Sequence, residues 1–162
     1  MCGGRKVHVA HLEMSLTEPS AVPAPELVDE CSDDLIPSTV DRWADAVDHA
    51  TEPCIVIDAK AVVAAASPAA CRLLGFAGPA AAVGACLHDG VLPLIDFAAT
   101  ANPLPDTELA KIPPMQALLS ERLARGLLRV RLRGDVVTID AVATPLLEGD
   151  DVVGSLTFFC TV

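Results

Sequence analysis

Residues 128–162 carry the pattern of three consecutive strands joined by tight turns. Apolar side chains alternate with arginines over 128–133 (LRVRLR), as in a strand that buries only one face. A Gly-Asp turn leads into an apolar run over 136–144, and an acidic turn (EGDD) leads into another over 152–162. Short turns join antiparallel strands, because a parallel pair needs a crossover of roughly a dozen residues. The C-terminal part of the chain is therefore predicted to form an antiparallel sheet.

Two further strands are predicted near the middle of the chain. Cys54–Asp58 is a short apolar run, Ala59-Lys60 is a turn, and residues 62–66 form a second apolar run. Runs of this length, rich in Val and Ile and bounded by turn residues, are typical of strands. Together with the C-terminal strands they predict five strands.

Three helices accompany these strands. Ser38 is a good N-cap for a helix that carries Val40, Trp43, Ala44, Val47 and Ala50 at helical spacing, and Pro53 ends it. Ser67 caps a second helix, which has Pro68 at its first position and stops at Gly75. A third is predicted to begin at Pro113-Pro114 and end at Gly126, with apolar side chains on one face (Met115, Leu118, Leu119, Leu123). The fold class is therefore α+β, an antiparallel sheet with helices on one face and a flanking N-terminal helix.

Composition divides the chain into three parts. Residues 1–37 are predicted to be a disordered leader, because they are acidic, contain several prolines and lack a core pattern. Residues 38–52 form the flanking helix, and residues 53–162 form the folded domain. Apolar residues make up 52% of the chain and aromatic ones 3%, so Ala, Val, Leu and Ile must build the core.

The same numbers exclude several classes of function. No apolar run approaches the roughly 18 residues of a membrane span, and no signal-peptide core is present, so a cytoplasmic location away from membranes is expected. The net charge of −11 argues against a nucleic-acid partner. The six cysteines show no C-x-x-C pair, which favours buried or idle thiols over a metal site or disulfides.

Three motifs in this order resemble the PAS family of sensor domains. They are the hairpin that begins CIVID at residue 54, the helix SPAACRLLGF at 67–76, and the last turn and strand EGDDVVGSL at 148–156. The resemblance covers residues 40–162 and implies a PAS-like five-stranded sheet with a role in bacterial signal transduction or transcription regulation. This sequence departs from the usual family pattern at Ser67, where the family usually has Asn. It also departs at Ala59-Lys60, since the family usually has a Gly after the Asp that corresponds to Asp58.

No cofactor is expected, although the family includes flavin and haem sensors. Cys71 mimics part of a flavin-photoreceptor motif but lies on the wrong helix, and the chain has one Asn and one Gln to hold a flavin edge. A small buried side chain is the favoured interpretation of Cys71. His88 is interpreted as a surface loop residue rather than a haem or metal ligand.

The core is predicted either to be filled or to hold a small apolar ligand. Small and aliphatic side chains between sheet and helices would line such a pocket (Val63, Ala65, Ala70, Leu73, Leu119, Ala141, Ala143). Evenly packed Ala-rich cores usually leave no such space, so the filled core is favoured.

Two surfaces are predicted to contact proteins. Arginines on the third helix and the following strand form either a solvated face balanced by Asp140 or a docking stripe for an acidic partner, such as the leader (Arg122, Arg125, Arg129, Arg131, Arg133). Val40, Trp43 and Val47 either cover the sheet or pair two protomers.

The function predicted is a non-enzymatic PAS-type sensory and interaction domain that acts in trans on a separate signalling protein as a homodimer. The alternatives are a sensor for a hydrophobic ligand or haem, and a small α+β isomerase or hydrolase that uses Asp96 and Asp140.

Overall fold

The computed structural model describes residues 36–162, and the leader predicted over 1–37 lies outside this range apart from its last two residues. These residues form a six-stranded, fully antiparallel sheet in the order β2-β1-β6-β5-β4-β3. The strands are β1 (Cys54–Asp58), β2 (Val63–Ala66), β3 (Leu94–Ile95), β4 (Ala124–Leu132), β5 (Asp135–Glu148) and β6 (Asp151–Thr161). The α+β class and the antiparallel pairing predicted from the sequence are confirmed.

The sixth strand is β3, which the sequence did not predict. Its two residues pair with Arg129 and Val130 at the edge of the sheet. Prolines at positions 93, 103 and 105 surround it, so the local sequence has the appearance of a loop. Pairing with β4, rather than any local preference, makes this segment a strand.

The helix after the first hairpin, α2 (Pro68–Leu74), begins and ends as its sequence predicts. Ser67 is its N-cap, and Gly75 ends it with a φ of 85° in the left-handed region. Before this helix, Asp58 stabilises the turn between β1 and β2, because its Oδ1 accepts hydrogen bonds from the amides of Lys60 and Val62. Three short helices follow, namely α3 (Pro79–Ala82), a 3₁₀ helix (Leu87–Asp89) and α4 (Asp106–Leu109).

The helix α5 (Pro113–Ser120) is shorter than predicted. It ends at Glu121, which has a φ of 57°, and the chain enters β4 three residues later. Leu119 and Leu123, predicted to face the core, are 66% and 67% exposed. Residues 124–132 pair with β5 along their whole length, and a longer helix would lose the first of these hydrogen bonds. Strand pairing therefore overrides the helical spacing of the leucines.

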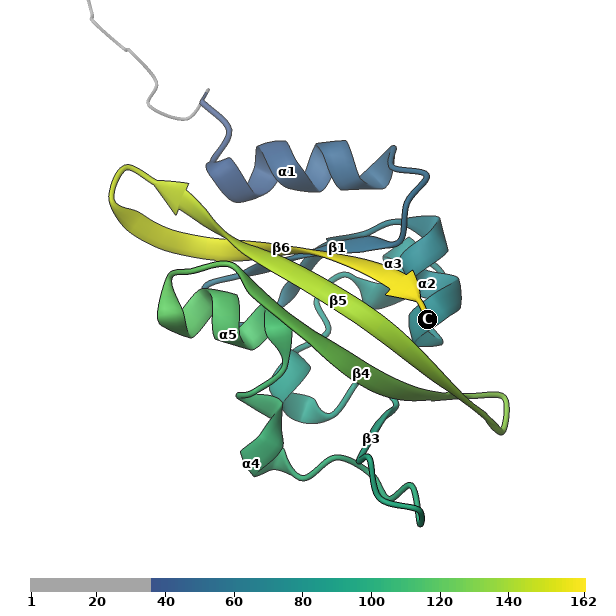
Figure 1. The fold of residues 1–162 in the computed structure, drawn as a ribbon. Coiled ribbons are helices and arrows are strands. Elements are labelled where there is room, and N and C mark those ends of the chain that lie inside the picture. The colour runs from purple at the N-terminus through teal and green to yellow at the C-terminus, as the bar shows by residue number, and fades with distance from the viewer. Residues whose placement is uncertain (1–35) are drawn as a thin grey trace, which may run out of the picture. The chain divides into compact units, whose positions relative to one another are not determined.

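The helices α2 to α5 cover one face of the sheet, as predicted, and the flanking helix covers part of the other. The larger core cluster lies on the face that carries Ile55, Ile57, Ile139 and Phe159, and it includes residues of α2, α3, α4 and α5. The helix α1 (Thr39–Asp48) packs on the opposite face, over β1, β2 and the adjoining parts of β5 and β6 (Figure 1). We call the first the inner face and the second the outer face. In residues 36–162, no helix is long and apolar enough to cross a membrane.

Candidate functional site

The helix α1 is held on the outer face by apolar packing and by a cap. Ser38 and Asp41 form a capping box, and the Thr39 amide donates a hydrogen bond of 3.0 Å to Glu148 Oε1. Val47 is 3% exposed and lies in one cluster with Cys54, Val56, Ala65, Leu146 and Leu156. Of the predicted dimer residues, Val47 therefore covers the sheet, Val40 packs partly against the same cluster, and Trp43 is 42% exposed.

Beyond α1, part of the outer face lacks a covering helix among the described residues. Strand register places Arg125, Val142 and Phe158 in one row across β4, β5 and β6. Leu127, Asp140 and Cys160 form the next row. Phe158 is 45% exposed and Leu127 is 51% exposed. Exposed aromatic and aliphatic side chains on neighbouring strands form an apolar patch, which we call the open face (Leu127, Val142, Phe158).

An ion pair lies within these two rows. Arg125 Nε is 3.0 and 3.1 Å from the two Asp140 oxygens, and its Nη2 also donates to Oδ2. The hydrogen bond from Arg125 lowers the pKa of Asp140, and the same contact raises the pKa of Arg125. Arg125 is on β4, not on a helix as predicted, and its charge is balanced by Asp140.

Two further arginines of the predicted stripe hold the loop 96–101 against β4. Arg129 Nη1 donates to the carbonyls of Asp96 and Ala98, and its guanidinium lies 5.7 Å from the centre of the Phe97 ring. Arg131 Nη2 donates to the Ala101 carbonyl. Asp96, the carboxylate of the enzyme alternative, accepts hydrogen bonds from the amides of Ala98 and Asn102 and so shapes the same loop. These contacts come from residues about thirty positions away, which no local pattern displays.

The remaining arginines have no hydrogen bond or ion pair within residues 36–162. Arg122 lies in the connection after α5, and Arg133 lies in the turn between β4 and β5 with a φ of 51°. Arg72 on α2 shares this property, and the sequence does not predict it as a site residue, because SPAACRLLGF has the pattern of a capped helix. Three of the five predicted arginines are thus engaged within the fold, and two are not.

The predicted pocket residues are distributed over separate parts of the core. Val63, Ala70 and Ala141 belong to the larger cluster, Ala65 lies under α1, and Ala143 packs with Ala117 and Ala124. Of the seven, Leu73 alone lines one of the three surface pockets described here. An interior pocket therefore stays a prediction without a cavity to support it.

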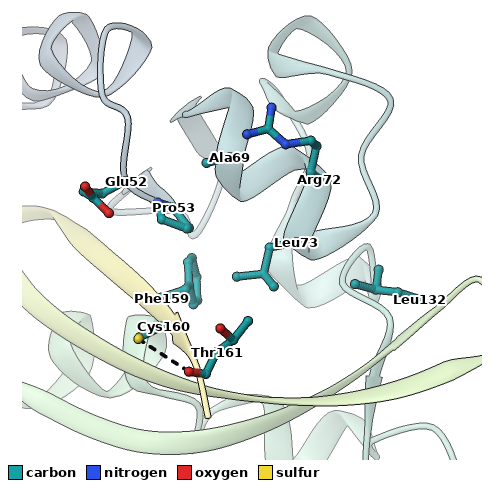
Figure 2. Close-up of a pocket in the computed structure, with 9 residues that line it drawn as sticks. All are labelled: Glu52, Pro53, Ala69, Arg72, Leu73, Leu132, Phe159, Cys160 and Thr161. Carbon is teal, nitrogen blue, oxygen red and sulfur yellow. Dashed lines mark hydrogen bonds between the residues drawn. The ribbon is translucent and has the colours of Figure 1, made fainter.

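Two of the surface pockets adjoin each other beside α2. The first, of about 510 Å³, lies between Ala69, Arg72 and Leu73 of α2 and the end of β6, with Phe159 and Thr161 (Figure 2). The second, of about 850 Å³, extends toward the turn between β4 and β5 and includes Arg131 and Arg133. Arg72 and Leu132 line both. We call the two together the α2 groove. A third pocket, of about 160 Å³, lies between β3, α5 and β4.

The cysteines and the histidine singled out in the sequence occupy structural positions. Cys71 is 2% exposed in the larger core cluster and Cys54 is fully buried under α1. Burial raises the pKa of both thiols. His88 is exposed on its 3₁₀ helix. The described residues contain no group of three or more side chains that could hold a metal ion.

Comparison with known proteins finds similarity in structure only. No family model matches the sequence, and no curated protein matches it. A PAS domain from Colwellia psychrerythraea superimposes with a TM-score of 0.52 at 17% identity, covering 77% of this chain and 98% of that one. The PAS domain of BvgS from Bordetella pertussis gives 0.51 at 10% identity, covering 77% and 86%.

A receptor is also among the similar structures. VqmA from Vibrio cholerae, described as a LuxR-type receptor, gives a TM-score of 0.54 at 14% identity, and the match covers 75% of this chain and half of that one. The three motifs behind the PAS resemblance form the elements that they predicted. The first hairpin is β1 and β2, Ser67 caps α2, and Gly154 lies in the last strand, β6. The chain therefore has the fold of a PAS domain.

Proposed function

We propose that this chain is a PAS-type sensory and protein-interaction domain that performs no catalysis and acts in trans on a separate signalling protein. The PAS fold supports the sensory part, since structures with this fold include VqmA, which is described as a LuxR-type receptor. The similarity to VqmA favours a sensory role in the regulation of transcription. The acting form is a homodimer in the cytoplasm.

The observation that carries this proposal is the open face. Leu127 on β4 and Phe158 on β6 are about half exposed on either side of β5, whereas the same side of the sheet under α1 is buried. The Arg125–Asp140 pair beside them places one positive and one negative group on the same surface. Two copies related by a twofold axis present the same patch to each other, so such a surface is able to pair with itself. Trp43 of α1, which is 42% exposed, is the dimer residue that we add to this contact.

The test is the mass of the full chain in solution. Sedimentation equilibrium is expected to give a dimer for the wild type and a monomer for Phe158→Glu, because the new carboxylate would be buried in the interface without a partner. Leu119→Glu is the matched control, since Leu119 is more exposed but lies on α5 at the inner face. A monomeric wild type at high micromolar concentration, or equal effects of the two variants, would contradict the proposal.

Docking of the signalling protein is assigned to the arginines that the fold leaves exposed. Arg122 and Arg133 are without internal partners in the described part of the chain, so their charges are available to an acidic surface. Rim charges of this kind set the rate and the salt dependence of association more than its final affinity. Charge-neutral variants at these positions are therefore expected to slow association with an acidic partner.

A ligand-responsive sensor is the second candidate, and the α2 groove favours it. Its two parts have volumes of about 510 and 850 Å³, in the size range of small-molecule sites.

A further inference from the structure

The α2 groove has an apolar floor along its first part. Leu73 points from α2 toward Phe159 at the end of β6, and Pro53 and Leu132 complete this floor (Figure 2). Leu73 and Leu132 are half-buried, so water contacts apolar side chains there. An apolar chain that covered them would remove this surface from water, which is favourable in proportion to the area covered.

The second part of the groove concentrates positive charge. Its lining includes Arg72, Arg131 and Arg133, against the single carboxylate of Asp135. Arg72 and Arg133 make no hydrogen bond or ion pair inside residues 36–162, and Arg131 uses one guanidinium nitrogen on the Ala101 carbonyl. The ion pairs of the described chain, Lys111–Glu108 and Arg125–Asp140, lie elsewhere.

This concentration stands out because the whole chain is acidic. With 22 acidic against 11 basic residues, most of its surface repels anions, yet three of those basic residues line one pocket. Guanidinium groups present several N–H donors in a plane, a geometry that matches the paired oxygens of a carboxylate or phosphate. An anion is therefore drawn to this end of the groove.

We propose that the α2 groove binds a single-chain amphiphile, with its apolar chain along Leu73, Leu132 and Phe159 and its anionic head between Arg72 and Arg133. The shared residues Arg72 and Leu132 join the two environments, so one molecule is able to span both. The site lies outside the packed interior, between α2 and the ends of β4, β5 and β6. Such a ligand would supply the signal for the sensory role proposed above; its biological use depends on that role, whereas its binding does not.

The test is a titration of the ¹⁵N-labelled full chain with decanoate below its micelle concentration. Amide shifts are expected around Arg72, Leu73, Leu132 and Arg133, with saturation. The double variant Arg72→Gln/Arg133→Gln is expected to weaken decanoate binding by about tenfold or more, because each guanidinium donates charged hydrogen bonds to the head. Arg122→Gln, which removes an exposed charge outside the groove, is the matched control and is expected to leave the affinity unchanged.

Three further probes separate the parts of the ligand. Decanol has the chain without the charge and acetate has the charge without the chain, so both are expected to bind at least about tenfold more weakly than decanoate. Decyl phosphate has the same chain as decanol but a phosphate head group. Comparison of its affinity with that of decanoate shows whether the site prefers a phosphate or a carboxylate.

Three results would overturn the proposal: no saturable shift with either anionic amphiphile, equal affinity for decanol, or shifts at Ala70 and Ala141 in the interior instead of the groove. Each leaves the test of the dimer unaffected, so failure of the ligand site and failure of the interaction role are distinguishable.

Discussion

Ser67 is the residue on which the start of the domain depends most. Its hydroxyl is fully buried and makes three hydrogen bonds: it accepts from the amides of Cys54 and Ala70, both at 3.1 Å, and donates to the Glu52 carbonyl at 2.7 Å. One side chain therefore caps α2 and also fixes the entry of β1.

Replacement of Ser67 by Ala is expected to lower the free energy of unfolding by about 2–3 kcal/mol. The variant loses an N-cap, and it leaves the buried Cys54 amide and the partly buried Glu52 carbonyl without this partner. Ser38→Ala is the matched control, because Ser38 caps α1 at the surface and its loss is expected to cost about 1 kcal/mol. Urea denaturation of both variants measures the difference. Equal losses would show that the buried contacts of Ser67 add nothing to capping.

At the scale of elements, the pairing of β1 with β6 depends on a close backbone approach at Gly154. A Cβ atom built there would lie 2.3 Å from the Ile57 carbonyl oxygen and 3.2 Å from a Val40 methyl group. The first contact is with backbone, so no side-chain rotation relieves it. Only glycine allows β1 and β6 to pair while α1 rests on them.

Gly154→Ala is accordingly expected to destabilise the protein by about 3 kcal/mol, since the two strands must separate to accommodate the methyl group. The control is Gly78→Ala, where the backbone is extended and no atom lies within 4 Å of the new Cβ. Gly78→Ala is expected to change the free energy of unfolding by less than about 0.5 kcal/mol. Thermal unfolding of both proteins compares them, and a mild effect at Gly154 would mean that the strands adjust freely.

The ion pair between β4 and β5 predicts how stability depends on pH. Because Arg125 lowers the pKa of folded Asp140, the pair contributes its full stabilisation above the unfolded pKa of Asp, about 3.9. That contribution is lost as the pH falls through the lower folded pKa. The stability difference between wild type and Asp140→Asn is therefore expected to be constant near about pH 7 and to shrink below about pH 4.

Denaturant unfolding at a series of pH values measures this difference, and Arg125→Gln serves as the control background. In that background, Asp140→Asn is expected to give a difference without this pH dependence, because the partner of the carboxylate is gone. A wild-type difference that grows on acidification would contradict the pairing.

The sequence predicts elements well where their signals are local. The N-cap, the proline at N1 and the left-handed glycine lie within the nine residues from 67 to 75, and α2 has the predicted ends. The same logic fails for α5, because residues 124–127 pair with residues 140–143 of β5, beyond the reach of a helical pattern within 113–126. It fails again for β3, whose partner strand lies more than thirty residues away.

The candidate site was also predictable only where its signals are local. Alternation along β4 correctly separates Arg129 and Arg131 from the buried side chain of Val130 between them, yet it could not reveal that both hold the loop 96–101. The α2 groove joins α2 to the ends of β4 and β6, and nothing in the sequence near Arg72 indicates these neighbours. Sequence thus identified the charged residues of β4, while the fold decides which charges remain available.

At the scale of the folded domain, the sheet separates two cores that are covered independently. Cys54 lies on the outer face under α1, whereas Cys71 lies on the inner face in the larger cluster. Both thiols are buried and their pKa values are raised, so both are protected from alkylation, which requires an exposed thiolate. Each cysteine therefore reports the opening of one face.

Val47→Asp is expected to detach α1 without unfolding the larger core, because it places a carboxylate in the apolar contact between α1 and the sheet. Iodoacetamide labelling, with each site identified by mass spectrometry, should then modify Cys54 at least about tenfold faster than in the wild type, while Cys71 stays protected. Ala46→Asp, on the exposed side of the same helix, should change neither rate. Faster labelling of Cys71 together with Cys54 would mean that the two cores unfold as one unit, and that α1 is part of the domain core and not a separable cover.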